Sequence, residues 1–136
     1  MKFNKNIPEL DVTNLKDSVS FYLTCGFEVE YERTEDKFVF LSLGEIQFML
    51  QELDGSDKWS VGVLEYPFGR GVNFQLEVDD VESIYRRVSK DYKIFEDLEE
   101  HWYRQENQLL GCKEFLVQDP DGYLLRFSED LGSKDI

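Results

Sequence analysis

Hydrophobic and polar positions follow the same order twice along the chain. Alternation from Ile7 to Val12 predicts a strand, and Asn14, with Asp17 three residues later, stands where a helix N-cap belongs. A helix is therefore predicted over residues 15–24, with Gly26 as its C-terminal stop. Turn residues then separate three predicted strands, at Phe27–Arg33, Lys37–Leu43 and Glu45–Glu52. This half of the chain is a βαβββ module.

The pattern restarts after a segment rich in turn residues. Residues 54–69, with turn chemistry at Asp54 to Asp57 and at Pro67 to Arg70, indicate a linker. Alternation resumes at Val72–Val78, and Asp79 and Asp80 begin a second helix. Three further strands are predicted at Tyr92–Asp97, Lys113–Gln118 and Tyr123–Ser128.

The repeat sets the fold class and the domain organisation. Residues 10–15 and 76–81 show the same passage from strand to cap to helix. Such short units cannot bury both faces alone, so the two modules are expected to pack against each other. The sequence therefore predicts a single α+β domain over residues 1–136, with tandem βαβββ modules at about 5–53 and 70–130 and a linker at about 54–69.

Charge and composition exclude some partners. The chain has 29 acidic and 15 basic residues, a net charge of −14, which repels nucleic acid and anionic membranes. This charge would attract a cationic ligand, although an acidic surface also serves solubility alone. No apolar run reaches the ~20 residues that span a bilayer, and the N-terminus lacks the apolar stretch of a signal peptide, so we expect a cytoplasmic protein. Cys25 and Cys112 are expected to be buried, reduced thiols.

Three motifs together resemble a known family. They are Asn14–Tyr22, Val78–Val81 and Asp119–Phe127, the last an Asp-Pro-Asp-Gly turn followed by an alternating strand. With these motifs the chain resembles the glyoxalase/bleomycin-resistance/dioxygenase family, also called the vicinal-oxygen-chelate superfamily, from Ile7 to Glu129. The resemblance implies that the two modules form a curled mixed sheet, a cup that holds a ligand, with the helices on its convex face.

The resemblance also indicates whether this chain can bind a catalytic metal ion. In metal-using members four inward positions supply His and Glu ligands, and by motif these positions fall at Ile7, Met49, Asn73 and Arg126. A catalytic divalent cation needs about three imidazole or carboxylate ligands, and a guanidinium would repel it. The one histidine, His101, lies in the variable part of the second module and cannot build a site alone. We therefore expect no metal and no other cofactor.

Strand alternation selects candidate binding residues for the cup. If Val72, Phe74 and Leu76 face the helix, Asn73 and Gln75 face the cup, together with Arg126 of the last predicted strand. Polar groups such as Gln75 could instead satisfy one another. An inward arginine needs an anionic partner, which a ligand or one of the acidic residues Glu9, Asp11 and Glu77 could supply.

Aromatic residues complete the candidate site. Trp59, and Trp102 with Tyr103, are predicted in irregular segments that rim the cup in this family, although a loop tryptophan can equally pin its loop to the core. Phe38 and Phe40 share one side of a strand and could line the cup floor or pack in the core. The predicted ligand-binding residues are Phe38, Phe40, Met49, Trp59, Asn73, Gln75, Trp102 and Arg126.

Three functions remain open from the sequence. The first is a metal-independent protein of the bleomycin-resistance type that sequesters a flat, cationic, aromatic small molecule and acts as a homodimer, as the resemblance implies. The second is a lyase or isomerase acting on a small carbonyl compound, with Glu77 or Glu9 as base and Arg126 as electrophile. The third is a domain that binds a metabolite for regulation.

Overall fold

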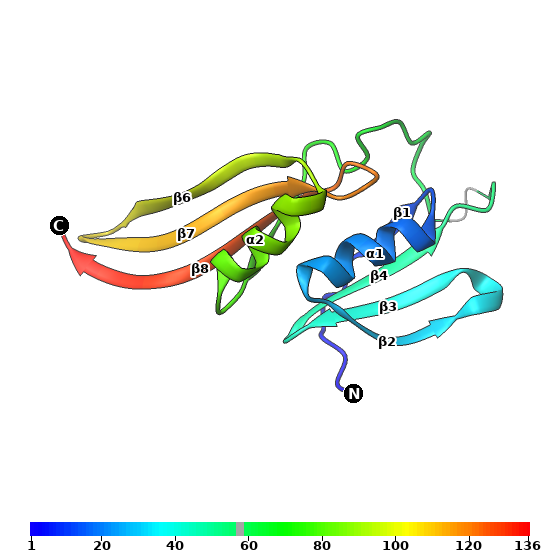
Figure 1. Ribbon diagram of the computed structural model, residues 1–136, viewed down its shortest axis with the longest axis horizontal. Helices are drawn as coiled ribbons and strands as arrows, with labels where there is room; N and C mark the ends of the chain where they lie inside the picture. The colour runs from blue at the N-terminus through cyan, green and yellow to red at the C-terminus, as the bar shows by residue number, and fades with distance from the viewer. Residues whose placement is uncertain (57–58) are drawn as a thin grey trace. The chain divides into compact units, whose positions relative to one another are not determined.

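The computed structural model describes residues 1–56 and 59–136, and the chain forms two units, Met1–Phe68 and Gly69–Ile136 (Figure 1). The predicted linker lies across their boundary, and its residues Asp57 and Lys58 are outside the described residues. The other residues between Glu52 and Asn73 form no helix or strand. That the two modules join in one domain around a common cup stays a prediction.

The first unit is a βαβββ module, as predicted. Its strands pair in the order β1-β4-β3-β2, with β1 parallel to β4 and the other pairs antiparallel. A short 3-10 helix, η1 (Thr34–Asp36), joins β2 to β3. The other elements are β1 (Glu9–Val12), α1 (Leu15–Cys25), β2 (Glu28–Arg33), β3 (Phe38–Leu43) and β4 (Ile46–Glu52).

Helix α1 has the predicted ends and covers one face of this sheet. The Asn14 side chain accepts the backbone N–H of Asp17 at 3.0 Å, and Gly26 ends the helix with a φ of 108°. Phe21 and Tyr22 are fully buried, and the Tyr22 ring packs edge-on against Phe48 of β4. Burial of these apolar side chains against the sheet holds the helix in place.

The second unit repeats the module. Its strands pair in the order β5-β8-β7-β6, again with only the first pair parallel, and α2 lies over the sheet (Figure 1). Tyr85 of α2 packs edge-on against Phe115, which stacks on Phe127. The elements are β5 (Asn73–Glu77), α2 (Val81–Asp91), β6 (Ile94–Gln105), β7 (Gln108–Gln118) and β8 (Leu124–Asp135).

Both units tie the helix to the sheet with the same contact. The first backbone N–H of α1, at Leu15, donates to Glu52 at the end of β4, at 3.0 Å. The first backbone N–H of α2, at Val81, donates to Glu129 of β8, also at 3.0 Å. A helix N-terminus has unpaired N–H groups and a partial positive charge, which a carboxylate satisfies. The α+β architecture of two repeated βαβββ modules is thus confirmed.

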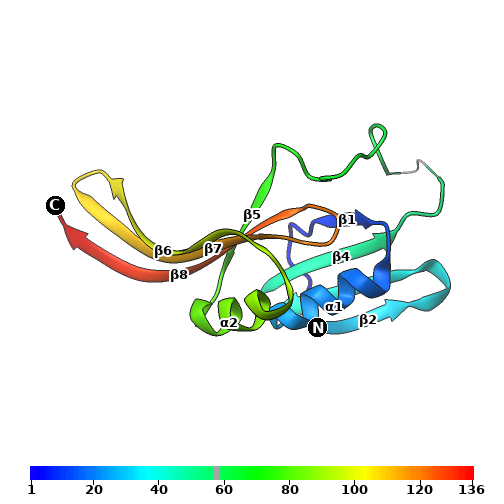
Figure 2. The ribbon, with the colours of Figure 1, turned by 45° about the horizontal axis from the view of Figure 1, so that its top comes forward.

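Three strands of the second unit are longer than predicted. In Figure 2, β6, β7 and β8 run together well beyond β5 as a curved ribbon. Trp102 and Tyr103 lie within β6, paired with Gly111 and Leu110 of β7, so the prediction that they occupy an irregular segment is wrong. Residues 96–100 are acidic at four of five positions, which masks the alternation of a strand, and pairing with β7 imposes the extended conformation.

The cysteines differ in burial. Cys25, the last residue of α1, is a fully buried thiol, as predicted. Cys112 is only half-buried, because the pocket-facing side of β7 leaves its thiol in a cavity, so the prediction of burial is wrong for this residue. Neither cysteine forms a disulfide with a described residue. Neither helix in the described ranges has the length and apolar character needed to cross a membrane.

Candidate functional site

The sheet of the second unit separates apolar from polar side chains. Phe74, Leu125 and Phe127 lie on the side of α2, and the alternate positions of the same strands point to the other face. Register places Gln75 beside Arg126, and Glu77 beside Ser128. The face opposite the helix is therefore polar.

A cavity of about 310 Å³ opens on this polar face. Strands β5, β8, β7 and β6 all contribute to its lining, so the whole sheet positions the site. The lining residues are Gln75, Glu77, Tyr103, Leu110, Gly111, Cys112, Glu114, Arg126, Ser128 and Asp130. A volume of this size admits a small molecule.

One side of the cavity is a hydrogen-bonded network around Glu114. This carboxylate is only 5% exposed, and the Tyr103 hydroxyl donates to its Oε1 at 2.9 Å. Nε2 of His101 lies 4.0 Å from the same oxygen and 3.5 Å from Glu99. The bond to Glu114 raises the pKa of Tyr103, so the phenol stays protonated at neutral pH.

The Cys112 thiol belongs to the same network. It is hydrogen-bonded to Ser128 and to Glu114, and burial is the main cause that raises its pKa. A thiol that keeps its proton at neutral pH is a weak nucleophile. The network therefore shapes and polarises the cavity, and it offers no activated nucleophile.

The other side of the cavity carries groups without partners. Among the described residues Arg126 forms no ion pair, and its Nε is buried without a hydrogen-bond partner. Gln75 and Glu77 lie on β5, the strand that pairs with β8 beside Arg126. Their side chains form no hydrogen bond with any described residue. Because Arg126 lines the cavity with no ion-pair partner in the described part of the chain, an anionic or strongly polar acceptor brought by a ligand would stabilise its guanidinium charge.

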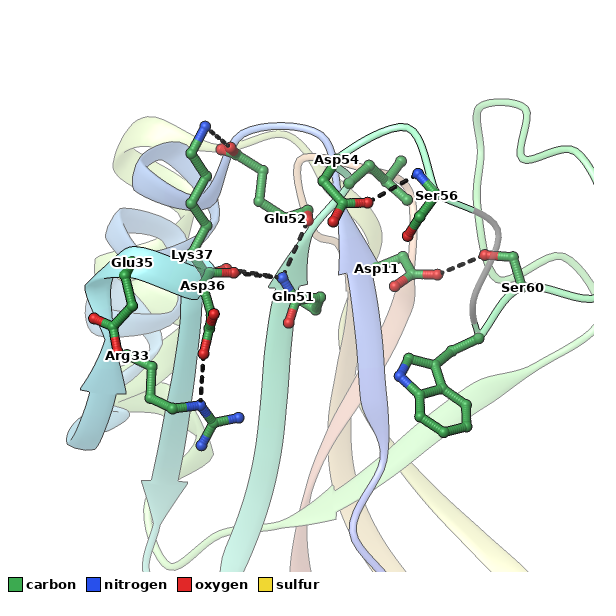
Figure 3. Close-up of a pocket in the computed structure, with 12 residues that line it drawn as sticks. Asp11, Arg33, Glu35, Asp36, Lys37, Gln51, Glu52, Asp54, Ser56 and Ser60 are labelled. Carbon is green, nitrogen blue, oxygen red and sulfur yellow. Dashed lines mark hydrogen bonds and ion pairs between the residues drawn. The ribbon is translucent and has the colours of Figure 1, made fainter.

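The first unit has a pocket of its own, of about 470 Å³ (Figure 3). It lies at the end of β4, between η1 and the loop that carries Trp59 and Ser60. Acidic side chains dominate its wall. The lining residues are Asp11, Arg33, Glu35, Asp36, Lys37, Gln51, Glu52, Leu53, Asp54, Ser56, Trp59 and Ser60.

Most polar groups of this first pocket already bind one another, as the dashed lines in Figure 3 show. Arg33 pairs with Asp36 at 3.3 Å, and Lys37 pairs with Glu52 at 3.0 Å. The backbone N–H of Leu15 and then Lys37 lower the pKa of Glu52, which keeps it ionised. The polar groups of this pocket are thus largely satisfied by one another. The cavity of the second unit is therefore the better candidate site.

The predicted aromatic and thioether residues of the first unit lie together on the sheet face away from α1. Phe38 and Phe40 are 2% and 1% exposed, and Phe40 stacks on Tyr31 and meets Phe3 edge-on. Met49 pairs with Phe40 in the sheet and is half-buried. None of these three predicted residues lines either pocket, whereas Trp59 lines the pocket of the first unit.

The predicted residues of the second unit divide in the same way. Gln75 and Arg126 line the cavity. Asn73 begins β5 on the same face but outside the lining. Trp102 packs over Gly111, donates to Glu100 at 2.9 Å and lies under the Lys134 ammonium, 3.9 Å from the ring centroid. These contacts make Trp102 a brace of the hairpin.

The predicted ligand-binding residues did not include the network residues Tyr103, Cys112 and Glu114. Successive side chains of a strand point to opposite faces of the sheet, and this rule could have identified Glu114. Phe115 and Val117 face the helix, so Glu114 must face the cavity. Tyr103 and Cys112 lie on the parts of β6 and β7 that were not predicted as strand.

Comparison with known proteins identifies the family. A glyoxalase/bleomycin resistance protein/dioxygenase superfamily member from Vibrio splendidus 12B01 is 40% identical to this chain, and the match covers 90% of this chain and 95% of that protein, with a TM-score of 0.45. The sequence identity over nearly the full length decides the relationship. The chain belongs to the glyoxalase/bleomycin resistance/dioxygenase superfamily. No family model and no curated protein matches it.

Solved structures of low sequence identity share the superfamily fold. A glyoxalase/bleomycin resistance protein/dioxygenase from Alicyclobacillus acidocaldarius is 19% identical with a TM-score of 0.63, covering 94% of this chain and 92% of that one. TioX from Micromonospora sp. ML1 is 18% identical with a TM-score of 0.70, covering 92% and 97%. Identities this low support the fold alone.

The four positions that bind metal in other members of the superfamily do not fit a cation here. Ile7 precedes β1 and Met49 lies in β4, and neither offers a hard donor. In the second unit the positions hold Asn73 and Arg126, an amide and a fixed positive charge. Within residues 1–56 and 59–136 no three His, Cys, Asp or Glu side chains cluster as a metal site.

Proposed function

We propose that this superfamily member is a metal-independent small-molecule-binding protein, and that the cavity of its second unit holds the ligand. The observation that carries the proposal is Arg126. By the resemblance Arg126 falls at a metal-ligand position of the superfamily, and it lines the cavity without an ion-pair partner among the described residues. A ligand carbonyl or carboxylate would pair with this guanidinium.

Sequestration fits this cavity better than catalysis by an activated nucleophile. The thiol and the phenol in its wall are both held protonated, as the raised pKa values of Cys112 and Tyr103 indicate. We extend the proposal to a cytoplasmic homodimer that protects its host by binding a toxic or antibiotic compound. In the first unit, Trp59 is exposed beside the acidic pocket and would offer a separate stacking surface for a cationic aromatic compound.

A thermal-shift screen tests the binding function. The panel contains bleomycin, small aldehydes and acidic metabolites, each with and without EDTA or added zinc. A ligand at 100 times its Kd stabilises the folded protein by about 2.7 kcal/mol, and the shift should not depend on the metal. A panel without any binder, or a binder that needs stoichiometric zinc, would refute the proposal.

Arg126 variants locate the site. Arg126→Met should abolish the increase in melting temperature that a bound compound gives. Arg126→Lys, which keeps the charge but loses Nε, should reduce that increase. Arg86→Met is the matched control, because Arg86 is an exposed residue of α2 outside the cavity. Equal shifts in all three variants would place the ligand elsewhere.

A second candidate function is proton transfer on a small carbonyl compound, as in an isomerase. Glu114 favours it, since a buried carboxylate in the same cavity as Arg126 could remove a proton while the guanidinium polarises the carbonyl. Exchange of the α-proton in D₂O, followed by NMR, should then require Glu114 and fail in Glu114→Gln. If no compound that binds exchanges its α-proton, the isomerase function is excluded and sequestration is the function that stands.

A further inference from the structure

The unpartnered groups of the cavity lie together on two neighbouring strands. Gln75 and Arg126 are paired positions of β5 and β8, and Glu77 is two residues further along β5, on the same face. Glu77 is therefore the diagonal neighbour of Arg126, a separation of roughly 7–8 Å between backbone positions in a sheet. A cation and an anion that form no ion pair within residues 1–56 and 59–136, together with one amide, thus line a short stretch of wall.

The other lining groups are already engaged. Glu114 accepts a hydrogen bond from Tyr103, and Cys112 is bonded to Ser128. Asp130, further along β8, accepts the backbone N–H of Gly132 at 2.8 Å. Ligand selection therefore depends on Arg126, Gln75 and Glu77.

Arg126 and its diagonal neighbour Glu77 carry opposite charges, even though the chain as a whole carries −14. Arg126 alone would attract any anion, but Glu77 beside it repels a second negative group and attracts a positive one. A simple dicarboxylate or a phosphate ester would meet repulsion at Glu77. A simple amine would be repelled by the Arg126 guanidinium and would bring it no acceptor.

We propose that the cavity selects a small zwitterion, a molecule with a carboxylate or strongly polarised carbonyl for Arg126 and an ammonium group a few bonds away for Glu77, with the Gln75 amide between them. This inference rests on the proposed binding function and names its ligand class. It replaces the expectation of a purely cationic ligand for this cavity.

A matched series of probes tests the ligand class. The compounds are ω-amino acids from glycine to 6-aminohexanoate, the alkanoates that lack the amine, and the alkylamines that lack the acid. Binding is measured by ¹H–¹⁵N NMR of the full chain, with the Arg126 Nε–H resonance, assigned by its loss in Arg126→Lys, as the local readout. At least one amino acid should bind tenfold or more tightly than its alkanoate and its alkylamine, and should move that resonance.

Substitutions test separately the residue that binds the ammonium group and the residue that binds the carboxylate. Glu77→Gln should remove the gain from the amine without weakening the binding of the alkanoate. Arg126→Met and Arg126→Lys should weaken both the amino acid and the alkanoate. Glu96→Gln removes the same charge from β6 outside the cavity and should change neither affinity.

Failure of this inference is separable from failure of the binding function. If alkanoates bind as tightly as amino acids, or Glu77→Gln changes nothing, the zwitterion assignment is wrong while binding at Arg126 stands. If no compound of the series moves the Arg126 resonance but another compound of the thermal-shift panel does, the ligand class is wrong and the site is right. If neither set binds, both proposals fall.

Discussion

At the scale of single residues, two glutamates perform the same task in the two units. Glu52 and Glu129 each accept the first backbone N–H of the helix in their own module, at 3.0 Å. Neither carboxylate belongs to a motif that the sequence analysis singled out. Their equivalence shows that the repeat extends to a side-chain contact between helix and sheet.

Glu52→Gln should lower the melting temperature at pH 7. The pKa of Glu52 lies below its ordinary value of 4.5, chiefly because of the Leu15 N–H and then Lys37, so its ionised form is favoured in the folded state. That stabilisation is complete above pH 4.5 and is lost as the pH falls through the lowered pKa. The difference between wild type and variant should therefore be largest at neutral pH.

Thermal unfolding followed by circular dichroism at pH 7 and pH 3 measures this difference. Glu32→Gln is the control, since it removes an equal charge from the exposed face of β2. A Glu52→Gln difference that persists unchanged at pH 3 would contradict the assigned contact.

Sequence predicted part of the candidate site at this scale. Alternation placed Gln75 and Arg126 on the face away from the helix, and both line the cavity. It missed Glu114 because a buried carboxylate is unusual and its stabilising partner, Tyr103, comes from another strand. Such a partnership depends on strand register, which no single segment encodes.

At the scale of elements, the helices and the first four strands follow the predicted pattern closely, whereas the long β6–β7 hairpin does not. Caps and stops such as Asn14 and Gly26 are local signals, so they can be located in the sequence. The outer part of β6 is held by pairing with β7 and by Trp102 packed over Gly111. These contacts join residues on different strands, and the acidic composition of β6 hides them.

Gly111→Ala should destabilise the protein by about 1–3 kcal/mol, because the new methyl group would lie in the space of the Trp102 ring. A Cβ at this position would approach that ring to 2.5 Å. Chemical denaturation measures the loss, and Trp102 emission in a Trp59→Phe background reports the displaced ring.

Gly62→Ala is the matched control for this substitution. Gly62 has ordinary backbone geometry, and a Cβ there meets nothing within 4 Å. Equal stability of the two variants would mean that Trp102 does not brace the hairpin.

At the scale of the whole molecule, acidic charge exceeds basic charge by 14. The ion pairs seen in the structure are exposed or partly exposed and contribute little individually. Repulsion among like charges therefore dominates the long-range electrostatics of the folded state.

Added salt should consequently raise the melting temperature. Increasing NaCl from about 10 mM to about 100 mM shortens the Debye length from about 30 Å to about 10 Å and screens this repulsion. Differential scanning calorimetry at pH 7 measures the change, with equimolar sucrose as an uncharged control. A melting temperature that falls with salt would mean that the ion pairs outweigh the repulsion.

Strand β8 carries two sets of side chains that can change independently. Leu125 and Phe127 are buried against the helix side, while Arg126 and Ser128 line the cavity. Because neighbouring positions of one strand point in opposite directions, substitutions at Arg126, or at Gln75 and Glu77 of β5, leave the packing beneath α2 intact. A new ligand preference could thus evolve, or be engineered, through three surface positions without any compensating repair of the hydrophobic interior.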